Sequence, residues 1–329
     1  MHKSAGNAVD PEDVVSKYGA DILRLWVSLS DYQGDVRISE EILQGPIDTY
    51  RKIRNTVRYA LGNLYDYDPA KHKVPTKELA EMDKYMLGRL NSMIEEVRAG
   101  YEEFNFRRAM RALTDFCILD LSSFMLDASK DRLYTLGANA AGRRSAQTVL
   151  AEIVVDILQL MAPVLSFTAE EAWQTLRQTA LGRELAQSIF LTNLPANSSF
   201  IPDGRLETKW NEIRRIREGV QKFLEEARAQ KIIGSSLEAK VIFSTCDPST
   251  RAFLEETKDL WPEIAIVSQV EIKEGKDPLF VEIVHATGHK CARCWQWKDE
   301  VGTLKENDIC QRCADVLAAE KATVEIVHG

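Results

Sequence analysis

Glycine and proline are scarce in this 329-residue chain, at 17 and 10 residues. So few turn-forming residues argue against a loop-rich sandwich or barrel and favour a body made of helices. Long uncharged apolar runs are also missing, because the longest apolar stretch, residues 149–167, is interrupted by Glu152, Asp156 and Gln159. Such a segment cannot cross a bilayer facing lipid. No secretory signal follows Met1, so we expect a cytoplasmic protein that makes no membrane contact.

Excess positive charge is absent as well. The formal net charge is −8 at pH 7, which argues against holding nucleic acid through bulk positive charge but allows a local basic face. The five histidines are scattered, and neither a Ser/His/Asp set nor a glycine-rich phosphate loop can be assembled. The length predicts about two domains. Composition and spacing therefore predict a mainly α-helical protein without a self-contained active site.

Helical periodicity dominates the first part of the chain. Asp10 is placed to cap a first helix with Pro11 at its first position, and Gly19 to end it. From residue 39 to about 183, apolar residues recur at helical spacing. We expect helices that begin at Ser39 and Thr76, that span 107–133 and 140–161, and that begin at a capping box of Thr168 and Glu171. This series predicts an antiparallel helical bundle.

A small α/β module is expected after the bundle. Asn197–Ser199 and Pro202–Gly204 have the composition of a linker. The pattern that follows predicts a helix over 206–231, a helix from Asp247 to Trp261, and strands over 237–245, 264–272 and 279–284.

Four of the six cysteines lie near the C-terminus, as Cys291-x2-Cys294 and Cys310-x2-Cys313. Two such turns supply four thiolates, and the spacing predicts a four-cysteine zinc site. The alternatives are two disulfides, which need an oxidising compartment, or a redox pair beside a βαβ unit. A segment this short cannot bury a core of its own, so the metal would provide most of its stability. Cys117 and Cys246 have apolar neighbours and are expected to be buried.

Two features have both a structural and a functional interpretation. Trp295 and Trp297 follow the first cysteine pair, where they either pack over the zinc turns or stack on an unpaired base. Basic residues gather at 51–58 and 214–217, where they either form ion pairs along a solvated helix face or contact phosphates. Spacing alone favours the structural interpretation of both features.

Several segments in order carry a resemblance to one family. Met1–Asn7 with Tyr18–Arg24 is similar to the KMSKS signature and its downstream helix, although the first lysine is absent and His2 stands where serine is usual. The other matching segments are Ala162–Pro163, Phe167–Trp173, Asp120–Ser122, Lys130–Tyr134, Ile233–Ala239 and Cys291–Trp295. Together they resemble the class I aminoacyl-tRNA synthetases, most closely the bacterial isoleucine enzymes.

The resemblance implies a division of the chain and a set of roles. Residues 1–37 would be the remainder of the signature loop with stem-contact helices, 38–197 the helical anticodon-binding domain, 198–287 an α/β junction module and 288–329 the zinc finger. The nucleotide-binding Rossmann fold and the editing domain would precede Met1, so we expect a C-terminal part that is inactive alone. Lys3 would be the catalytic second lysine of the signature, acting on ATP with Mg2+ in the complete enzyme.

The partner implied by the resemblance is tRNA(Ile), bound by a monomer, with no DNA partner. The residues that become candidate tRNA contacts are Arg51, Arg54, Arg58, Arg214, Arg215, Arg217, Arg293, Trp295 and Arg312. Two rival functions remain open. One is a DNA-binding protein with a four-cysteine finger of the DNA-glycosylase type, although those enzymes need an N-terminal proline. The other is a structural zinc module for protein contacts.

Overall fold

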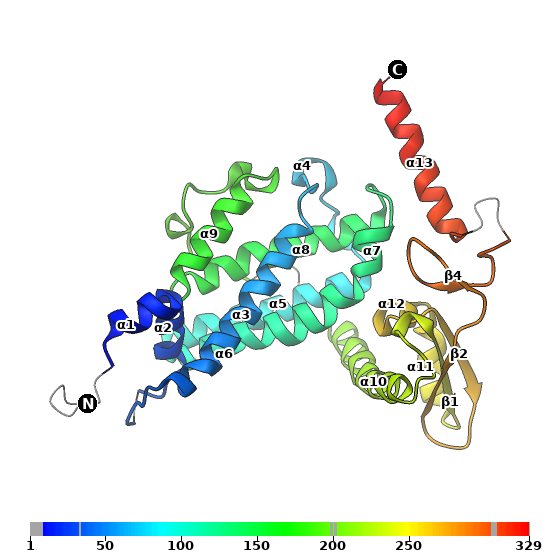
Figure 1. Ribbon diagram of the computed structural model, residues 1–329, viewed down its shortest axis with the longest axis horizontal. Coiled ribbons are helices and arrows are strands. Elements are labelled where there is room, and N and C mark those ends of the chain that lie inside the picture. The colour runs from blue at the N-terminus through cyan, green and yellow to red at the C-terminus, as the bar shows by residue number, and fades with distance from the viewer. Residues whose placement is uncertain (1–8, 33, 198–199, 201–202, 304–307, 329) are drawn as a thin grey trace. The chain divides into compact units, whose positions relative to one another are not determined.

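The computed structural model describes residues 9–32, 34–197, 200, 203–303 and 308–328, and the fold is mainly helical, as predicted (Figure 1). The chain divides into two compact units, each made of two sequence segments. Unit 1 comprises residues 1–126 and 144–203, and unit 2 comprises 127–143 and 204–329. The pairing of residues 127–143 with the C-terminal part was not anticipated. Within the described residues, no helix has the length and apolar character needed to span a membrane.

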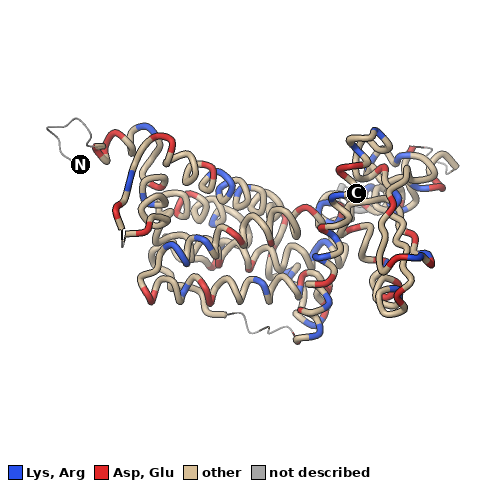
Figure 2. Tube along the Cα trace, turned by 90° about the horizontal axis from the view of Figure 1, so that it is seen from below, with Lys and Arg blue, Asp and Glu red and all other residues tan. Residues whose placement is uncertain are grey.

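Unit 1 is a bundle of helices. Its elements are α1 (Pro11–Tyr18), α2 (Ala20–Leu29), α3 (Glu40–Gly62), α4 (Pro69–His72), α5 (Glu81–Glu102), α6 (Phe106–Asp115), a π-helical segment (Phe116–Leu126), α8 (Ala141–Met161, from Arg144 onward) and α9 (Ser166–Arg177). Fully buried side chains such as Ile53, Leu90, Leu121 and Leu150 form its core. Acidic and basic residues are interleaved along these helices (Figure 2).

Two predicted helix starts in unit 1 are confirmed. The Asp10 side chain accepts a hydrogen bond from the Glu12 N–H at 3.0 Å, and the helix ends at Gly19, whose φ of 92° suits glycine. Ser39 accepts from the Ile42 N–H at 3.2 Å and caps α3. Local side-chain hydrogen bonds therefore set these ends, as the sequence indicates.

The predicted capping box at Thr168 and Glu171 is wrong. Helix α9 begins earlier, at Ser166. The Thr168 backbone N–H and hydroxyl both bond the buried carboxylate of Asp21, at 2.8 and 2.6 Å. Thr168 therefore anchors α9 to α2 from within the first turn, through a partner 147 residues away in sequence.

Of the other predicted helices, two differ from the prediction in their bounds and one is confirmed. The expected helix over 107–133 is three pieces, α6, the π-helical segment and α7 (Lys130–Thr135), of which α7 belongs to unit 2. The helix predicted from Thr76 begins at Glu81, after a short 3-10 turn. The helix predicted over 140–161 is confirmed as α8.

Unit 2 holds a mixed three-stranded sheet. Its strand order is β2 (Gln269–Glu274), β1 (Ala239–Thr245), β3 (Phe280–His285), with β1 parallel to β2 and antiparallel to β3. The other elements are α7, α10 (Gly204–Ala229), α11 (Pro248–Glu256), α12 (Trp261–Ala265), β4 (His289–Lys290), β5 (Trp297–Lys298) and α13 (Gln311–His328). All three predicted strands exist, but the second begins at Gln269 because residues 261–265 are helical.

The two isolated cysteines have different environments. Cys117 is fully buried in the π-helical segment, and burial raises the pKa of its thiol to about 12, so it is an inert packing residue. Cys246 is exposed, which contradicts the prediction. Its backbone N–H bonds the Asp277 carbonyl at 2.8 Å, just after β1 ends, and this turn holds the thiol at the surface.

The carboxyl of Asp156 on α8 predicts how the stability of unit 1 depends on pH. Burial and the charge of Glu152 raise the pKa of this half-buried carboxyl to about 7. Because the unfolded value lies near 3.9, the native state favours the protonated form, and stability is lost as pH rises from about 4 to 7. We expect Asp156→Asn to stabilise the chain at pH 8, by no more than about 4 kcal/mol, and to change little at pH 4. Urea unfolding at both pH values measures this, with exposed Glu102→Gln as the control; equal effects at both pH values would contradict it.

Candidate functional site

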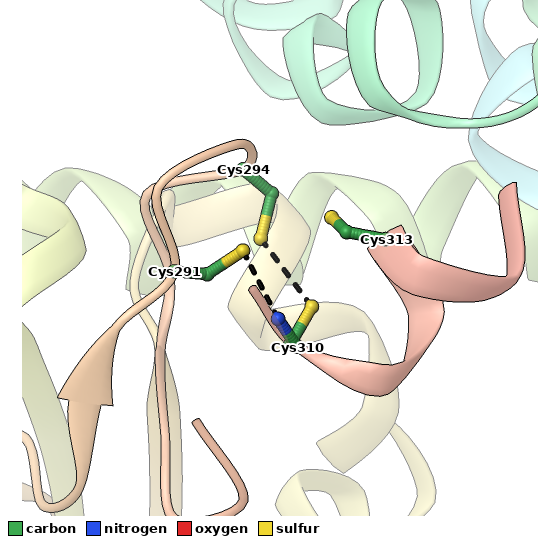
Figure 3. Close-up of side chains that lie close together, drawn as sticks. All are labelled: Cys291, Cys294, Cys310 and Cys313. Carbon is green, nitrogen blue, oxygen red and sulfur yellow. Dashed lines mark hydrogen bonds between the residues drawn. The ribbon is translucent and has the colours of Figure 1, made fainter. Parts of the chain in front are cut away.

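The four C-terminal cysteines come together in unit 2. Cys291 follows β4 and Cys294 lies in the next turn, while Cys310 precedes α13 and Cys313 lies in its first turn. Their sulfur atoms all lie within 4.8 Å of one another, and all four residues are buried. Figure 3 shows the sulfurs of Cys291, Cys294 and Cys310 turned toward a common centre. The group could hold a metal ion.

The donor set and spacing fit a tetrahedral thiolate site. A Zn–S bond of about 2.3 Å gives tetrahedral sulfurs about 3.8 Å apart, and the Cys294 and Cys310 sulfurs are 3.8 Å apart. The backbone N–H of Cys310 donates to the Cys291 sulfur at 3.3 Å, and the Arg293 guanidinium donates to the Cys313 sulfur at 3.7 Å. Both contacts direct an N–H donor at a sulfur, and they would partly neutralise the net charge of about −2 that a zinc ion with four thiolates carries.

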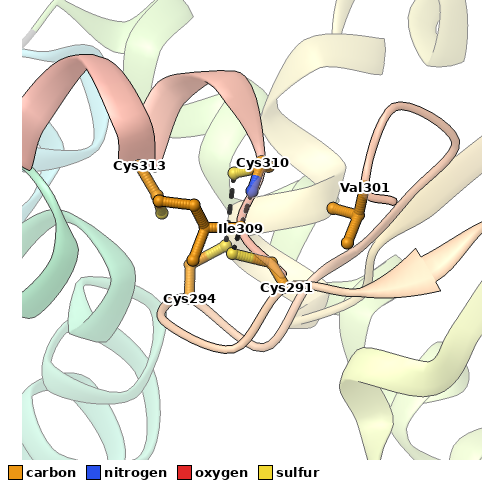
Figure 4. Close-up of a cluster of buried hydrophobic side chains, with 6 residues drawn as sticks. All are labelled: Cys291, Cys294, Val301, Ile309, Cys310 and Cys313. Atoms are coloured by element: carbon orange, nitrogen blue, oxygen red, sulfur yellow. Dashed lines mark hydrogen bonds between the residues drawn. The ribbon is translucent and has the colours of Figure 1, made fainter. Parts of the chain in front are cut away.

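The apolar core around the cysteines is small. Besides the cysteines, its buried members among the described residues are Val301 and Ile309 (Figure 4), and the partly buried Ala314 and Leu317 pack against it. The hairpin that carries the first pair depends on Gly288, which has a φ of 83° and whose added Cβ would lie 2.4 Å from the Lys298 backbone. So few aliphatic groups cannot offset the chain entropy of the segment.

Helix α7 holds the cysteine cluster from the other sequence segment of unit 2. Arg312, between Cys310 and Cys313, donates to both carboxylate oxygens of Asp131 at 2.5 and 2.8 Å, and Arg293 donates to the Thr135 carbonyl. Burial alone would raise the pKa of Asp131, but the hydrogen bonds from Arg312 and Thr135 outweigh burial and lower it. The two arginines between the cysteines therefore fix the cluster to α7.

A cavity of about 420 Å³ adjoins the cysteine cluster within unit 2. Its lining is mostly apolar and includes Tyr134, Ile266 and Trp295. Trp295 is 60% exposed and Tyr134 is 56% exposed. Trp295 and Ile266 have positive φ values, 65° and 59°, which are strained for bulky or β-branched residues. Such strain is typical of functional positions.

The two tryptophans that follow the first cysteine pair have different surroundings. Trp297 packs edge-on against His285, with ring centroids 4.5 Å apart. Trp295 does not pack over the zinc turns as a core residue, because most of its ring is exposed; the Lys290 ammonium lies 5.5 Å from its centroid. An exposed ring beside a cation can stack on a base near a phosphate.

The predicted phosphate-contacting arginines have unequal surroundings. Arg217 is 12% exposed and donates to the Ile264 carbonyl at 2.7 Å. Its guanidinium is therefore held inside unit 2. Arg215 forms two hydrogen bonds to Glu212, at 2.8 and 2.7 Å, and its neighbour Arg214 is half-buried. Arg217 is thus engaged inside unit 2, whereas Arg215 stays at the surface in an exposed pair with Glu212.

The α3 arginines of unit 1 are more available. Arg51 lies 3.6 Å from Asp48 and Arg54 3.7 Å from Glu171, both exposed ion pairs that contribute little energy. Arg58 is exposed and has no hydrogen-bond or ion-pair partner within the described part of the chain. Lys3, the predicted catalytic residue, lies outside the described residues.

Sequence reasoning did not find the α7 residues that hold the cysteine cluster. Asp131 meets Arg312 across 181 residues of sequence. No periodicity or local motif links two positions so far apart, although the Lys130–Tyr134 segment contributed to the family resemblance.

Two family models match this chain. Residues 1–39 match the family model of tRNA synthetases class I (I, L, M and V), and residues 83–243 match the anticodon-binding domain of tRNA ligase. The isoleucine–tRNA ligase of Caldicellulosiruptor saccharolyticus is 46% identical over 321 residues, which are 96% of this chain and 34% of that protein. That of Caldicellulosiruptor bescii is 44% identical over 324 residues, 97% of this chain and 35% of that protein.

A solved complex of a leucine enzyme, LeuRS, with tRNA from Agrobacterium radiobacter superposes with a TM-score of 0.44 at 17% identity, over 74% of this chain and 24% of that chain. A likeness this weak carries no argument. The sequence matches are decisive, and the chain belongs to the class I aminoacyl-tRNA synthetases. Within that class its relatives are isoleucine–tRNA ligases, and it spans about a third of their length.

The Asp131–Arg312 pair yields a test of unit 2. Asp131→Ala leaves Arg312 without its carboxylate partner. We expect the free energy of opening of this part of unit 2 to fall by about 1–2 kcal/mol, after allowing for the partial exposure of the pair. Amide hydrogen exchange in α7 and in residues 311–321 measures the loss. Because the folded pKa of Asp131 is lowered, this stabilisation is present above about pH 4 and disappears as pH falls below it. Exposed Asp259→Ala is the control; equal protection in both variants would contradict the role of the pair.

Proposed function

We propose that the chain is the tRNA-binding region of an isoleucine–tRNA ligase and that its partner is tRNA(Ile). The observation on which this rests most is the 46% identity over 96% of the chain to a protein of that name. The parent enzyme would join isoleucine to tRNA at the expense of ATP, with Mg2+. Lys3 would stabilise the charge on the phosphates there. We propose that it works as a monomer in the cytoplasm, where translation uses its product.

Both units offer groups suited to RNA. In unit 1 the α3 arginines, of which Arg58 has no partner in the described part of the chain, suit contacts to phosphates. In unit 2 the exposed Trp295 ring and the adjacent apolar cavity suit an unpaired base. An acidic chain with such local groups would bind RNA selectively rather than bind polyanions in general.

The cysteine cluster, in this proposal, holds one Zn2+. Four buried thiols at tetrahedral spacing are the donor set of structural zinc sites, which keep no open position for substrate. The ion would close the turn that ends at Trp295 and so fix the ring. Its contribution is structural: it ties two sequence segments that have little core of their own.

The rival functions have less support. Arg293 and Arg312, which would contact DNA phosphates in a glycosylase-type finger, are engaged with Thr135 and Asp131. The same contacts occupy these two arginines as candidate tRNA contacts, so the RNA proposal rests on the α3 arginines and Trp295 instead. A purely structural zinc module does not account for the exposed, strained Trp295. The anticodon-binding family match over residues 83–243 further favours RNA.

The RNA proposal is tested by binding. We expect the chain to bind a tRNA(Ile) transcript at least about tenfold more tightly than the same transcript with a swapped anticodon, since each lost set of hydrogen bonds to a base edge costs about 1–3 kcal/mol. The affinity is expected to fall steeply with salt. Fluorescence anisotropy over a range of salt measures both, with duplex DNA as the competitor. Equal affinity for the two transcripts, or a preference for DNA, would reject the proposal.

The zinc proposal is tested by metal content and removal. We expect one zinc per chain after purification without chelators. Cys310→Ser should lose the metal and expose residues 288–321 to protease, because the small core cannot hold them. Cys246→Ser, which removes an exposed thiol outside the cluster, should change neither the zinc content nor the protease sensitivity. Metal-free protein with a protected C-terminal segment would contradict the proposal.

A further inference from the structure

Unit 1 contains a groove between α3 and α9. Its volume is about 570 Å³, within the range of small-ligand pockets. The lining includes the apolar Val57, Leu61 and Ala172. The last turn of α9 and the two residues after it add the side chains of Thr175, Gln178 and Thr179, of which the two hydroxyls donate to backbone carbonyls and keep their acceptor capacity. The groove is thus apolar in part and also able to hydrogen-bond.

The α3 side of the groove is basic. Arg54 and Arg58 line it at positions four residues apart, so they share a helix face. Glu171 is the acidic residue of the lining, and it lies 3.7 Å from Arg54 in an exposed pair. Such a pair is weak, so Arg54 can exchange Glu171 for a phosphate at little cost. The lining has one positive charge in excess, which favours an anionic occupant.

Tyr65 supplies an aromatic surface to the same groove. It lies just beyond the end of α3, seven residues after Arg58, and is 74% exposed. Base stacking on such a ring does not depend on the base. A groove with an aromatic surface, two arginines and a partly apolar lining offers what one nucleotide needs: a stacking surface, phosphate contacts and hydrogen-bonding groups for the base edge.

We propose that this groove binds one unpaired nucleotide of the tRNA, with the base on Tyr65 and the phosphate held by Arg58 and Arg54. The proposal rests on the proposed function and adds a site to it. A protein helix is a poorer occupant, because helix-binding grooves present a continuous apolar surface. Here three apolar side chains lie beside two arginines.

The test measures tRNA affinity of the full chain and its variants by fluorescence anisotropy. Tyr65→Ala should weaken binding about tenfold, whereas Tyr65→Phe, which keeps the ring, should stay within about twofold. Arg58→Gln should weaken binding and lower the salt slope by about one. Glu171→Gln should tighten binding, because it removes the acidic competitor. Tyr32→Ala, which changes another exposed tyrosine of unit 1 (63% exposed) outside the groove, is the matched control.

Chemical probing of the bound tRNA supplies a second readout. One unpaired nucleotide should be protected by the wild-type chain and by Tyr65→Phe but not by Tyr65→Ala. If Tyr65→Ala binds like Tyr32→Ala while the anticodon preference persists, the groove proposal fails and the proposed function stands. If Tyr65→Ala weakens tRNA binding but the wild-type chain and this variant protect the same nucleotides, the groove contacts no base and the proposal also fails. If the wild-type chain binds no tRNA, both fail together.

Discussion

The convergence of four cysteine sulfurs is the constraint on which the C-terminal part of this protein depends. The segment around them buries two aliphatic side chains besides the sulfurs, too little to fix its backbone without a cross-link or a metal. The turn from Cys291 ends at Trp295, whose backbone N–H donates to the Cys291 carbonyl at 2.9 Å and whose φ is 65°. The arginines between the cysteines bond Asp131 and Thr135, so α7 is held by the same cluster. The cysteine cluster, α7 and the turn that carries the exposed ring are thus joined within unit 2.

In unit 1 the candidate RNA-contacting groups have a different physical setting. Its core is a packed helical interior, and its candidate RNA-contacting groups lie on the solvent side of α3. Weak surface ion pairs leave those arginines able to change partners, whereas the buried Asp21 carboxylate holds α9 in place. A phosphate-binding helix face requires both features: a backbone that buried contacts hold in place, and surface arginines that can exchange a carboxylate for a phosphate.

Local chemistry explains what the sequence could predict. Caps at Asp10 and Ser39, the strand alternation around Val241 and the cysteine spacing depend on neighbouring residues, and each is confirmed. Long-range partners explain the failures: Thr168 bonds Asp21 instead of capping α9, and Cys246 is held at the surface by the Asp277 carbonyl. The predicted domain boundaries, Lys3 and the RNA contacts stay predictions.

The role of the cysteine cluster is tested by comparing tRNA(Ile) discrimination by the zinc-loaded chain with that of the chain after chelation, with circular dichroism recorded on both. We expect metal removal to abolish the preference for the native anticodon, because the Trp295 turn and the cavity that it lines lose their anchor, while most of the helical signal of the bundle remains. Full anticodon preference in a metal-free chain would contradict the claim that the cysteine cluster positions the RNA-binding surface.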